Sequence, residues 1–150
     1  MDYRLLCAQV RELAKEEGWY VPLMANASAL LYHSMEDLNW AGFYFVRGDE
    51  LVLGPFQGKV ACVRIPVGKG VCSAAVREDR TQRVANVHEF PGHIACDSAS
   101  NSEIVVPIHK DGKVVAVLDI DSPVLDRFSA EDQRGLETLV RVIEGVIEMD

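Results

Sequence analysis

Several features are scarce or missing in this sequence of 150 residues, and each shortage excludes a class of protein. Basic side chains are outnumbered, with 15 Lys and Arg against 23 Asp and Glu, and the formal net charge is -8. A protein that binds nucleic acid needs a basic patch to displace phosphate counterions, so we expect no nucleic acid partner. No stretch approaches the roughly 18 apolar residues of a membrane span, so we expect no membrane partner.

Export signals, internal repeats and linkers rich in Pro, Gly or Ser are also missing from the sequence. Residues 1–18 mix acidic and basic side chains with an amphipathic period, which is unlike a secretory signal or a transit peptide. We therefore expect a cytoplasmic protein and interpret 1–150 as a single domain. In a reducing compartment, the four cysteines are expected to be free, catalytic or metal-binding rather than joined in structural disulfides.

Hydrophobic periodicity predicts an α+β fold, with a central antiparallel sheet and helices packed on one face. Asp111-Gly112 is a strong hairpin signal, and Ser129 with Asp132 predicts the start of the last helix. We expect helices at 2–17, 22–36, 71–78 and 130–147, and strands at 40–47, 50–56, 60–67, 82–86, 103–110 and 113–121. The first helix should bury one apolar face that includes Leu5, with Cys7 beside it as a small hydrophobic residue.

Strand geometry places several polar side chains on the face away from the helices. Side chains of a strand alternate between faces, so Asp119 and Asp121 share one face and the intervening apolar residues pack under the helices. Glu103, at the start of the preceding strand, can join them. The simpler alternative is that these acids are solvated; held close together, they would raise one another's pKa and one could stay protonated near neutrality.

The same alternation places Trp40 and Tyr44 on one face of the first strand and two phenylalanines on the other. If the phenylalanines pack under the helices, the Trp and Tyr side chains line the pocket that holds the carboxylates and offer it apolar walls with polar edges. The alternative is that both aromatic residues belong to the ordinary core.

Three cysteines fall in different settings, which favours a division of roles. Close ligand pairs of the C-x2-C type are missing, so we expect no zinc site. Redox chemistry fits better, because Cys72 begins a predicted helix and Cys96 lies in a polar loop at 87–102 with His88 and His93, settings that lower a thiol's pKa. A nucleophile oxidised to sulfenic acid needs a second cysteine, and both Cys62 and Cys72 qualify. The residues alone leave open that these cysteines are buried hydrophobes.

Four stretches carry a resemblance that extends from about Tyr20 to Ile147: NWAGFYF, LVLGPFQGKVACVRIPVGKGVC, RVANVHEFPGHIACDSASNSEIVVPI and VLDIDSP. They closely resemble free methionine-(R)-sulfoxide reductases, a GAF-domain family. The resemblance implies a GAF fold, in which an antiparallel sheet carries helices on one side and a loop-covered ligand pocket on the other.

The resemblance also implies roles for the cysteines. Cys96 matches the nucleophile of the family, while Cys62 and Cys72 match its resolving or recycling cysteines, with Cys62 the closer match to the main resolver. Ser73, which follows Cys72, departs from the glycine that the family has at this position.

The acidic and aromatic residues match family positions as well. Glu103, Asp119 and Asp121 match the acids that hold the substrate amino group and assist protonation of the sulfoxide oxygen. Trp40 and Tyr44 match the wall around the sulfur and its methyl group.

The activity implied by the resemblance is reduction of free methionine-(R)-sulfoxide to methionine. The R configuration comes from the resemblance alone. The reaction passes through a cysteine sulfenic acid and a disulfide that thioredoxin or a similar dithiol reduces, without a metal or organic cofactor. A homodimer is a further option, because related domains often pair through their helices.

Two other functions remain open at this point. One is a GAF sensor that binds a small ligand without chemistry and should bind it unchanged when Cys96 is serine. The other is a redox switch that closes a disulfide between Cys62 and Cys96 without producing methionine.

Overall fold

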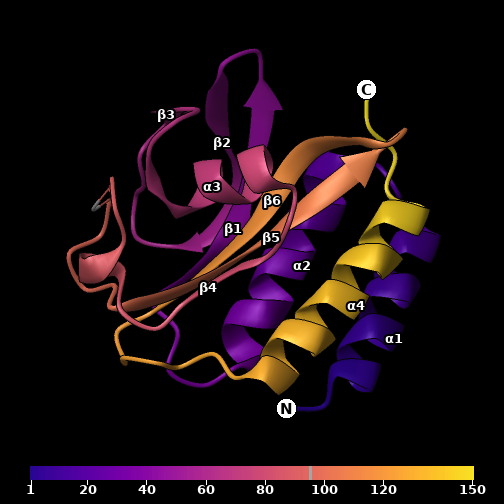
Figure 1. The fold of residues 1–150 in the computed structure, drawn as a ribbon. Coiled ribbons are helices and arrows are strands. Elements are labelled where there is room, and N and C mark those ends of the chain that lie inside the picture. The colour runs from indigo at the N-terminus through magenta and orange to yellow at the C-terminus, as the bar shows by residue number, and fades with distance from the viewer. Residues whose placement is uncertain (95) are drawn as a thin grey trace.

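Four α-helices and six strands make up the part of the chain that the computed structural model describes, residues 1–94 and 96–150 (Figure 1). The helices are α1 (Tyr3–Glu16), α2 (Tyr20–Ser34), α3 (Gly70–Glu78) and α4 (Ala130–Val146). The strands are β1 (Trp40–Arg47), β2 (Glu50–Gly58), β3 (Arg64–Pro66), β4 (Gln82–Val84), β5 (Ser102–Lys110) and β6 (Lys113–Ser122). A 3-10 turn, η1 (Val87–Glu89), follows β4.

The strands form one antiparallel sheet in the order β3-β2-β1-β6-β5-β4. Helices α1, α2 and α4 cover one face and bury a core that includes Phe43 of β1 and Leu118 and Ile120 of β6. The expected α+β fold with helices on one face is confirmed for these three. The short helix α3 packs on the opposite face, where its residues Val71 and Cys72 belong to a second apolar cluster (Figure 1).

Local sequence signals explain how several of these elements begin and end. Ser129 accepts a hydrogen bond from the backbone of Asp132, whose side chain accepts one in return, so the predicted capping pair starts α4. Asp111 and Gly112 both have positive φ, at 52° and 77°, as a tight turn between β5 and β6 requires. These two predictions are confirmed.

Two expectations for apolar residues are wrong. Leu5 is 54% exposed, whereas Leu6 and Val10, which were expected on the same face, are buried together with Cys7. The strand expected at 60–67 is reduced to the three residues of β3. Before β3, the carbonyl groups of Lys59 and Cys62 accept hydrogen bonds from side chains of β1 rather than from a neighbouring strand, so the alternation of apolar residues does not form a strand there.

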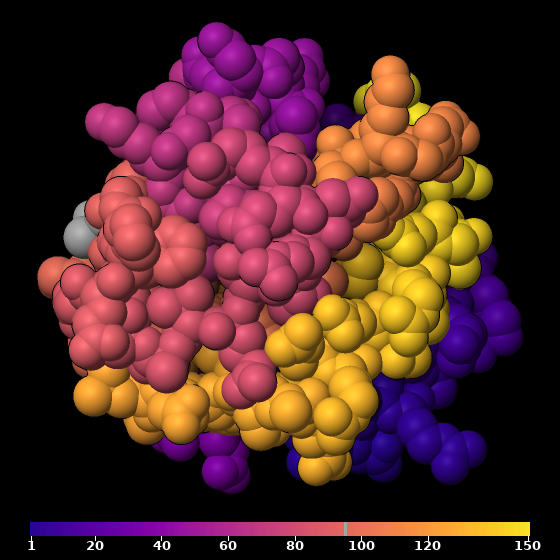
Figure 2. Space-filling model, viewed as in Figure 1, coloured from indigo at the N-terminus to yellow at the C-terminus, as the bar shows by residue number. Residues whose placement is uncertain are grey.

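Much of the chain between β4 and β5 lies on the surface of the molecule, beside α3 (Figure 2). Among the helices of residues 1–94 and 96–150, none is both long enough and apolar enough to cross a bilayer.

Candidate active site

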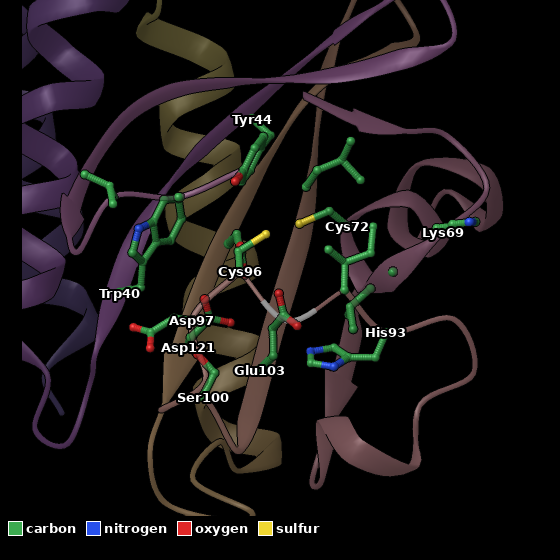
Figure 3. A pocket seen from close by; sticks show the side chains of 17 residues that line it. Trp40, Tyr44, Lys69, Cys72, His93, Cys96, Asp97, Ser100, Glu103 and Asp121 are labelled. Atoms are coloured by element: carbon green, nitrogen blue, oxygen red, sulfur yellow. The ribbon is translucent and has the colours of Figure 1, made fainter. Parts of the chain in front are cut away.

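A cavity of about 50 Å³ lies on the sheet face opposite α1, α2 and α4 (Figure 3). Its walls come from β1, β5, β6, the start of α3 and the loops at 60–61, 93–94 and 96–100. Seven of the eight residues singled out from the sequence line it: Trp40, Tyr44, Cys72, Cys96, Glu103, Asp119 and Asp121. The eighth, Cys62, is not among the lining residues, but it is bonded to one of them.

The three acids meet because of the strand register. Glu103 on β5 lies directly opposite Asp121 on β6, and Asp119 is two positions away on the same face of β6. Glu103 and Asp119 are buried, at 7% and 5% exposure. The predicted sharing of one face is confirmed, and the alternative that these acids are simply solvated does not hold for the two buried ones.

The pKa values of these three carboxyl groups are raised above their usual range, mainly because the groups are buried. Burial is the main cause that raises the pKa of Glu103, and the charges of Asp119 and Asp121 raise it further. Burial also raises the pKa of Asp121 and, although hydrogen bonds with its neighbours oppose this, that of Asp119. The site therefore holds carboxylic protons at a pH where a solvated aspartate has lost its proton.

One oxygen of this cluster is buried without a hydrogen bond. Oδ1 of Asp119 is buried and has no hydrogen-bond partner among residues 1–94 and 96–150. A buried carboxylate oxygen that accepts nothing costs free energy, on the order of 1–3 kcal/mol. A ligand that donates a hydrogen bond or brings a positive charge would remove this cost.

A disulfide joins Cys62 to Cys96 at the edge of the cavity. The two Cα atoms are 5.6 Å apart, although the residues are 34 positions apart in the sequence. Cys7 and Cys72 are free and buried. The sequence left open whether Cys62 or Cys72 pairs with Cys96, and in the structure the partner is Cys62. The two thiols must therefore approach one another in the folded protein.

Cys72 does not have the reactive character that its position at a helix start predicts. Burial is the main cause that raises its pKa, and the nearby charges of Asp119, Glu103 and Asp121 add to it. The expectation of a lowered pKa for this thiol is wrong, because the helix N-terminus is outweighed by a dry, acidic environment. A neutral thiol here is suited to donate a hydrogen bond to Asp119.

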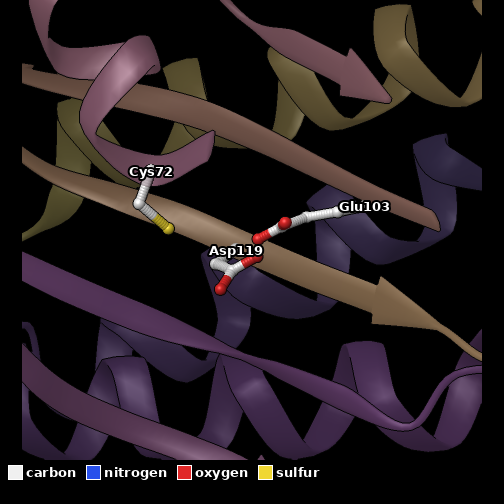
Figure 4. Close-up of side chains that lie close together, drawn as sticks. All are labelled: Cys72, Glu103 and Asp119. Atoms are coloured by element: carbon white, nitrogen blue, oxygen red, sulfur yellow. The ribbon is translucent and has the colours of Figure 1, made fainter. Parts of the chain in front are cut away.

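Cys72, Glu103 and Asp119 could hold a metal ion, since one ligand atom from each lies within 4.8 Å of the others (Figure 4). One thiol and two carboxylates would leave a fourth position of a tetrahedral zinc ion to water. To bind a cation, all three groups must lose protons that their surroundings favour keeping. The absence of a metal site stays a prediction.

Trp40 and Tyr44 form an aromatic wall that also holds the backbone near Cys62. Their rings stack with centroids 5.9 Å apart. The Trp40 indole N–H donates to the carbonyl of Lys59 at 3.2 Å, and the Tyr44 hydroxyl donates to the carbonyl of Cys62 at 2.9 Å. Both aromatic residues face the cavity, as the alternation along β1 predicts, and Phe43 faces the helices.

Known proteins of the same kind were found by sequence and by structure. The GAF domain family matches residues 24–148. The free methionine-R-sulfoxide reductase of Escherichia coli is 57% identical over 131 residues, which cover 87% of this chain and 79% of that protein. The chain belongs to the GAF-domain family of free methionine-R-sulfoxide reductases.

Solved structures of this reductase family superpose on nearly the whole chain. The reduced form of fRMsr from Staphylococcus aureus is 52% identical with a TM-score of 0.93, and the alignment covers 98% of this chain and 96% of that one. The free methionine-R-sulfoxide reductase of Neisseria meningitidis in complex with its substrate is 43% identical with a TM-score of 0.91, covering 95% and 86%. The resemblance inferred from the sequence is confirmed.

The structure adds residues to this reductase-type pocket that the sequence interpretation missed. Asn39, directly before β1, donates through Nδ2 to Asp97 Oδ2 at 3.0 Å and to Ser100 Oγ at 2.9 Å. These bonds tie the loop that carries Cys96 to the sheet. Asn39 precedes Trp40 and Asp97 follows Cys96 in the sequence. Being next to a predicted site residue was the only sequence signal that these two residues offered.

His93 also lines the cavity, but it does not supply a positive charge to Cys96. Burial lowers the pKa of His93, and the charge of His88 lowers it further. His93 is therefore a poorer source of positive charge for the nearby thiol than a solvated histidine.

Proposed function

We propose that this chain reduces free L-methionine-(R)-sulfoxide to L-methionine, with Cys96 as the nucleophile. The observation that carries the proposal is the position of the Cys62–Cys96 disulfide, at the edge of a cavity whose floor holds three acids with raised pKa values. The names of the E. coli and N. meningitidis relatives, and the substrate bound in the latter, support the same substrate.

The first step uses one thiolate and one carboxylic proton. The Cys96 thiolate attacks the sulfoxide sulfur, and a protonated carboxyl of Glu103, Asp119 or Asp121 donates its proton to the sulfoxide oxygen. Methionine leaves with its sulfur reduced, and the oxygen remains on Cys96 as a sulfenic acid. The raised pKa values support this role, because an acid that is already ionised at neutral pH cannot donate.

The second step forms the disulfide. The Cys62 thiolate attacks the sulfenic sulfur of Cys96, and the hydroxyl leaves with one proton as water. Each cycle converts one sulfoxide and two thiols into one methionine, one water and one disulfide. We assign the resolving role to Cys62, and the high pKa of the buried Cys72 supports placing Cys72 outside this step.

Preference for the free amino acid follows from the acids. The α-ammonium group of free methionine sulfoxide is a cation with three donors, whereas a peptide-bound residue offers one neutral amide. The unpartnered Oδ1 of Asp119 is the acceptor that such an ammonium group can use. The aromatic wall of Trp40 and Tyr44 would contact the sulfur and its methyl group.

A dithiol protein such as thioredoxin completes the cycle by reducing the disulfide. We place the reaction in a reducing compartment, the cytoplasm, where thioredoxin keeps thiols reduced. No step of this route draws on a metal or an organic cofactor.

Methionine production with thioredoxin, its reductase and NADPH tests the proposal directly. Wild type should release methionine from the free R-sulfoxide, and Cys96→Ser should release none above background. Cys7→Ser is the matched control, because Cys7 is a free cysteine in the helical core, and it should stay active. Activity in Cys96→Ser would remove its nucleophile role. A folded wild type that makes no methionine, even with dithiothreitol, would favour a GAF sensor or a redox switch.

A further inference from the structure

The two most exposed large apolar side chains in the described part of the chain flank one cysteine of the disulfide. Val60 is 88% exposed and Val63 is 62% exposed, on either side of Cys62 in the segment that joins β2 to β3 (Figure 1). Isolated exposed apolar residues are ordinary on protein surfaces. Two of them beside a disulfide that must be reduced in every cycle call for a functional explanation.

The segment is held firmly, so the exposure of its valines is built into the fold. Trp40 binds the carbonyl of Lys59, Tyr44 binds that of Cys62, and the backbone N–H of Leu53 binds that of Val63 at 2.9 Å. Both valine side chains are largely exposed, and Val60 also lines the cavity.

The disulfide cannot be reached by another protein from the cavity. A pocket that takes a single amino acid does not admit another protein, and Cys96 lines this pocket. Both cysteines of the bond are partly exposed, but Cys62, unlike Cys96, does not line the cavity. A protein thiol must therefore approach from outside, on the surface where Val60 and Val63 lie next to Cys62.

We propose that Val60 and Val63 form the docking surface for the dithiol protein that reduces this disulfide, a partner that presents its reactive cysteine on an apolar rim. The proposal rests on the proposed function, which creates the disulfide. The position of the bond decides the occupant, because a partner that transfers electrons to it must contact its immediate surroundings.

Docking there directs the attack to Cys62. The partner's thiolate attacks Cys62 Sγ, the Cys62–Cys96 bond breaks, and Cys96 leaves as a thiolate that takes up a proton or stays ready for the next sulfoxide. The second thiolate of the partner then attacks the partner's first sulfur in the mixed disulfide. The partner forms its own disulfide, and Cys62 leaves as a thiolate. Two electrons pass from the dithiol to the disulfide, and the cavity regains its nucleophile.

The test measures reduction of the oxidised protein by thioredoxin, without any methionine sulfoxide. Val63→Asp places a charge in the docking surface, and this residue does not line the cavity. We expect the second-order rate constant with thioredoxin to fall about tenfold, which is typical of losing a central apolar contact. The rate with dithiothreitol should stay unchanged. Val21→Asp, the same change on a partly exposed valine of α2 across the sheet, should alter neither rate.

Several outcomes would overturn the proposal. An unchanged thioredoxin rate for Val63→Asp would show that the surface is not used, and an equal loss with dithiothreitol would show damage to the disulfide itself. If Val63→Asp instead changed a dimer into a monomer, as measured by sedimentation, with normal reduction, the surface would be an interface between copies of this chain.

A second measurement locates the sulfur that is attacked. Thioredoxin whose second cysteine is replaced by serine should stop at a mixed disulfide, and peptide mass mapping should find it on Cys62. A mixed disulfide on Cys96 would contradict the docking geometry. Because neither measurement needs sulfoxide turnover, failure of docking and failure of the reductase activity are separate results.

Discussion

At the scale of single residues, the acids on β5 and β6 show how position changes chemistry. Asp119 and Asp121 have the same side chain as the solvated aspartates of the surface, but burial in a cluster with Glu103 raises their pKa values. The folded state therefore holds protons that the unfolded chain releases. This difference makes the stability of the protein depend on pH.

Glu103→Gln tests this linkage. Folding raises the pKa of Glu103 above the usual 4.5, so the folded state binds more protons from about that pH up to the raised pKa. The free energy of unfolding should then decrease as pH rises through this window, by up to about 1.4 kcal/mol per pH unit for each proton involved. Glutamine keeps the shape and does not titrate, so the variant should lose less stability than wild type between pH 5 and 8.

Urea unfolding of the oxidised proteins at several pH values measures the effect. Glu16→Gln, on the exposed surface of α1, is the control and should follow wild type. Parallel curves for wild type and Glu103→Gln would show that the carboxyl group of Glu103 titrates alike in the folded and unfolded states.

The sequence predicts that these acids share one face of the sheet, but it does not predict the raised pKa of the neighbouring Cys72. Alternation along β6 follows from backbone geometry, so Asp119 and Asp121 could be placed on one face without a structure. The pKa of Cys72 could not be obtained this way, because it depends on how α3 packs over Asp119. A helix start is visible in the sequence, whereas burial of its third residue against carboxyl groups is not.

At the scale of elements, β1 is the strand on which the site depends. It pairs with β2 and β6, and the register with β2 shifts between Gly42 and Tyr44. A Cβ atom at Gly42 would lie 2.3 Å from Cβ and 2.8 Å from Cα of Phe56. The close approach of the two strands at this shift therefore requires glycine.

Gly42→Ala should destabilise the protein by about 1–3 kcal/mol, because the backbone of β2 must move to admit one methyl group. Gly145→Ala is the matched control: nothing lies within 4 Å of its added Cβ in α4, and alanine is the better helix former, so stability should rise by about 0.5–1 kcal/mol. Urea unfolding compares the two. Equal effects of the two substitutions would show that β1 and β2 can separate at this point without cost.

The segment before β3 marks the limit of element prediction from sequence. Alternating apolar residues at 60–67 indicate a strand, but only Arg64–Pro66 pairs with β2. The carbonyls of Lys59 and Cys62 are bound by Trp40 and Tyr44, which come from a strand about 20 positions earlier. Long-range side-chain bonds of this kind override a local pattern, and only the folded chain reveals them.

At the scale of the whole molecule, the disulfide links two irregular segments on the same side of the sheet. The pairing could not be chosen from residue properties, because Cys62 and Cys72 are both within reach of a loop whose path the sequence does not specify. Folding brings Cys62 to within 5.6 Å of Cys96, Cα to Cα, and buries Cys72 beside the acids. The redox state of one bond therefore affects the stability of the entire fold.

Oxidation should stabilise the protein by about 3–4 kcal/mol, the chain-entropy estimate for closing a loop of this length in the unfolded state. Urea unfolding with and without dithiothreitol measures the difference. Cys62→Ser cannot form the bond, so dithiothreitol should leave its unfolding midpoint unchanged and near that of reduced wild type. If oxidised and reduced wild type unfold at the same urea concentration, the bond strains the folded state as much as it restricts the unfolded chain. If the bond is stabilising, its reduction costs free energy of folding in every cycle. A docked protein dithiol can still reduce it, because binding holds the thiols of the partner at a high local concentration.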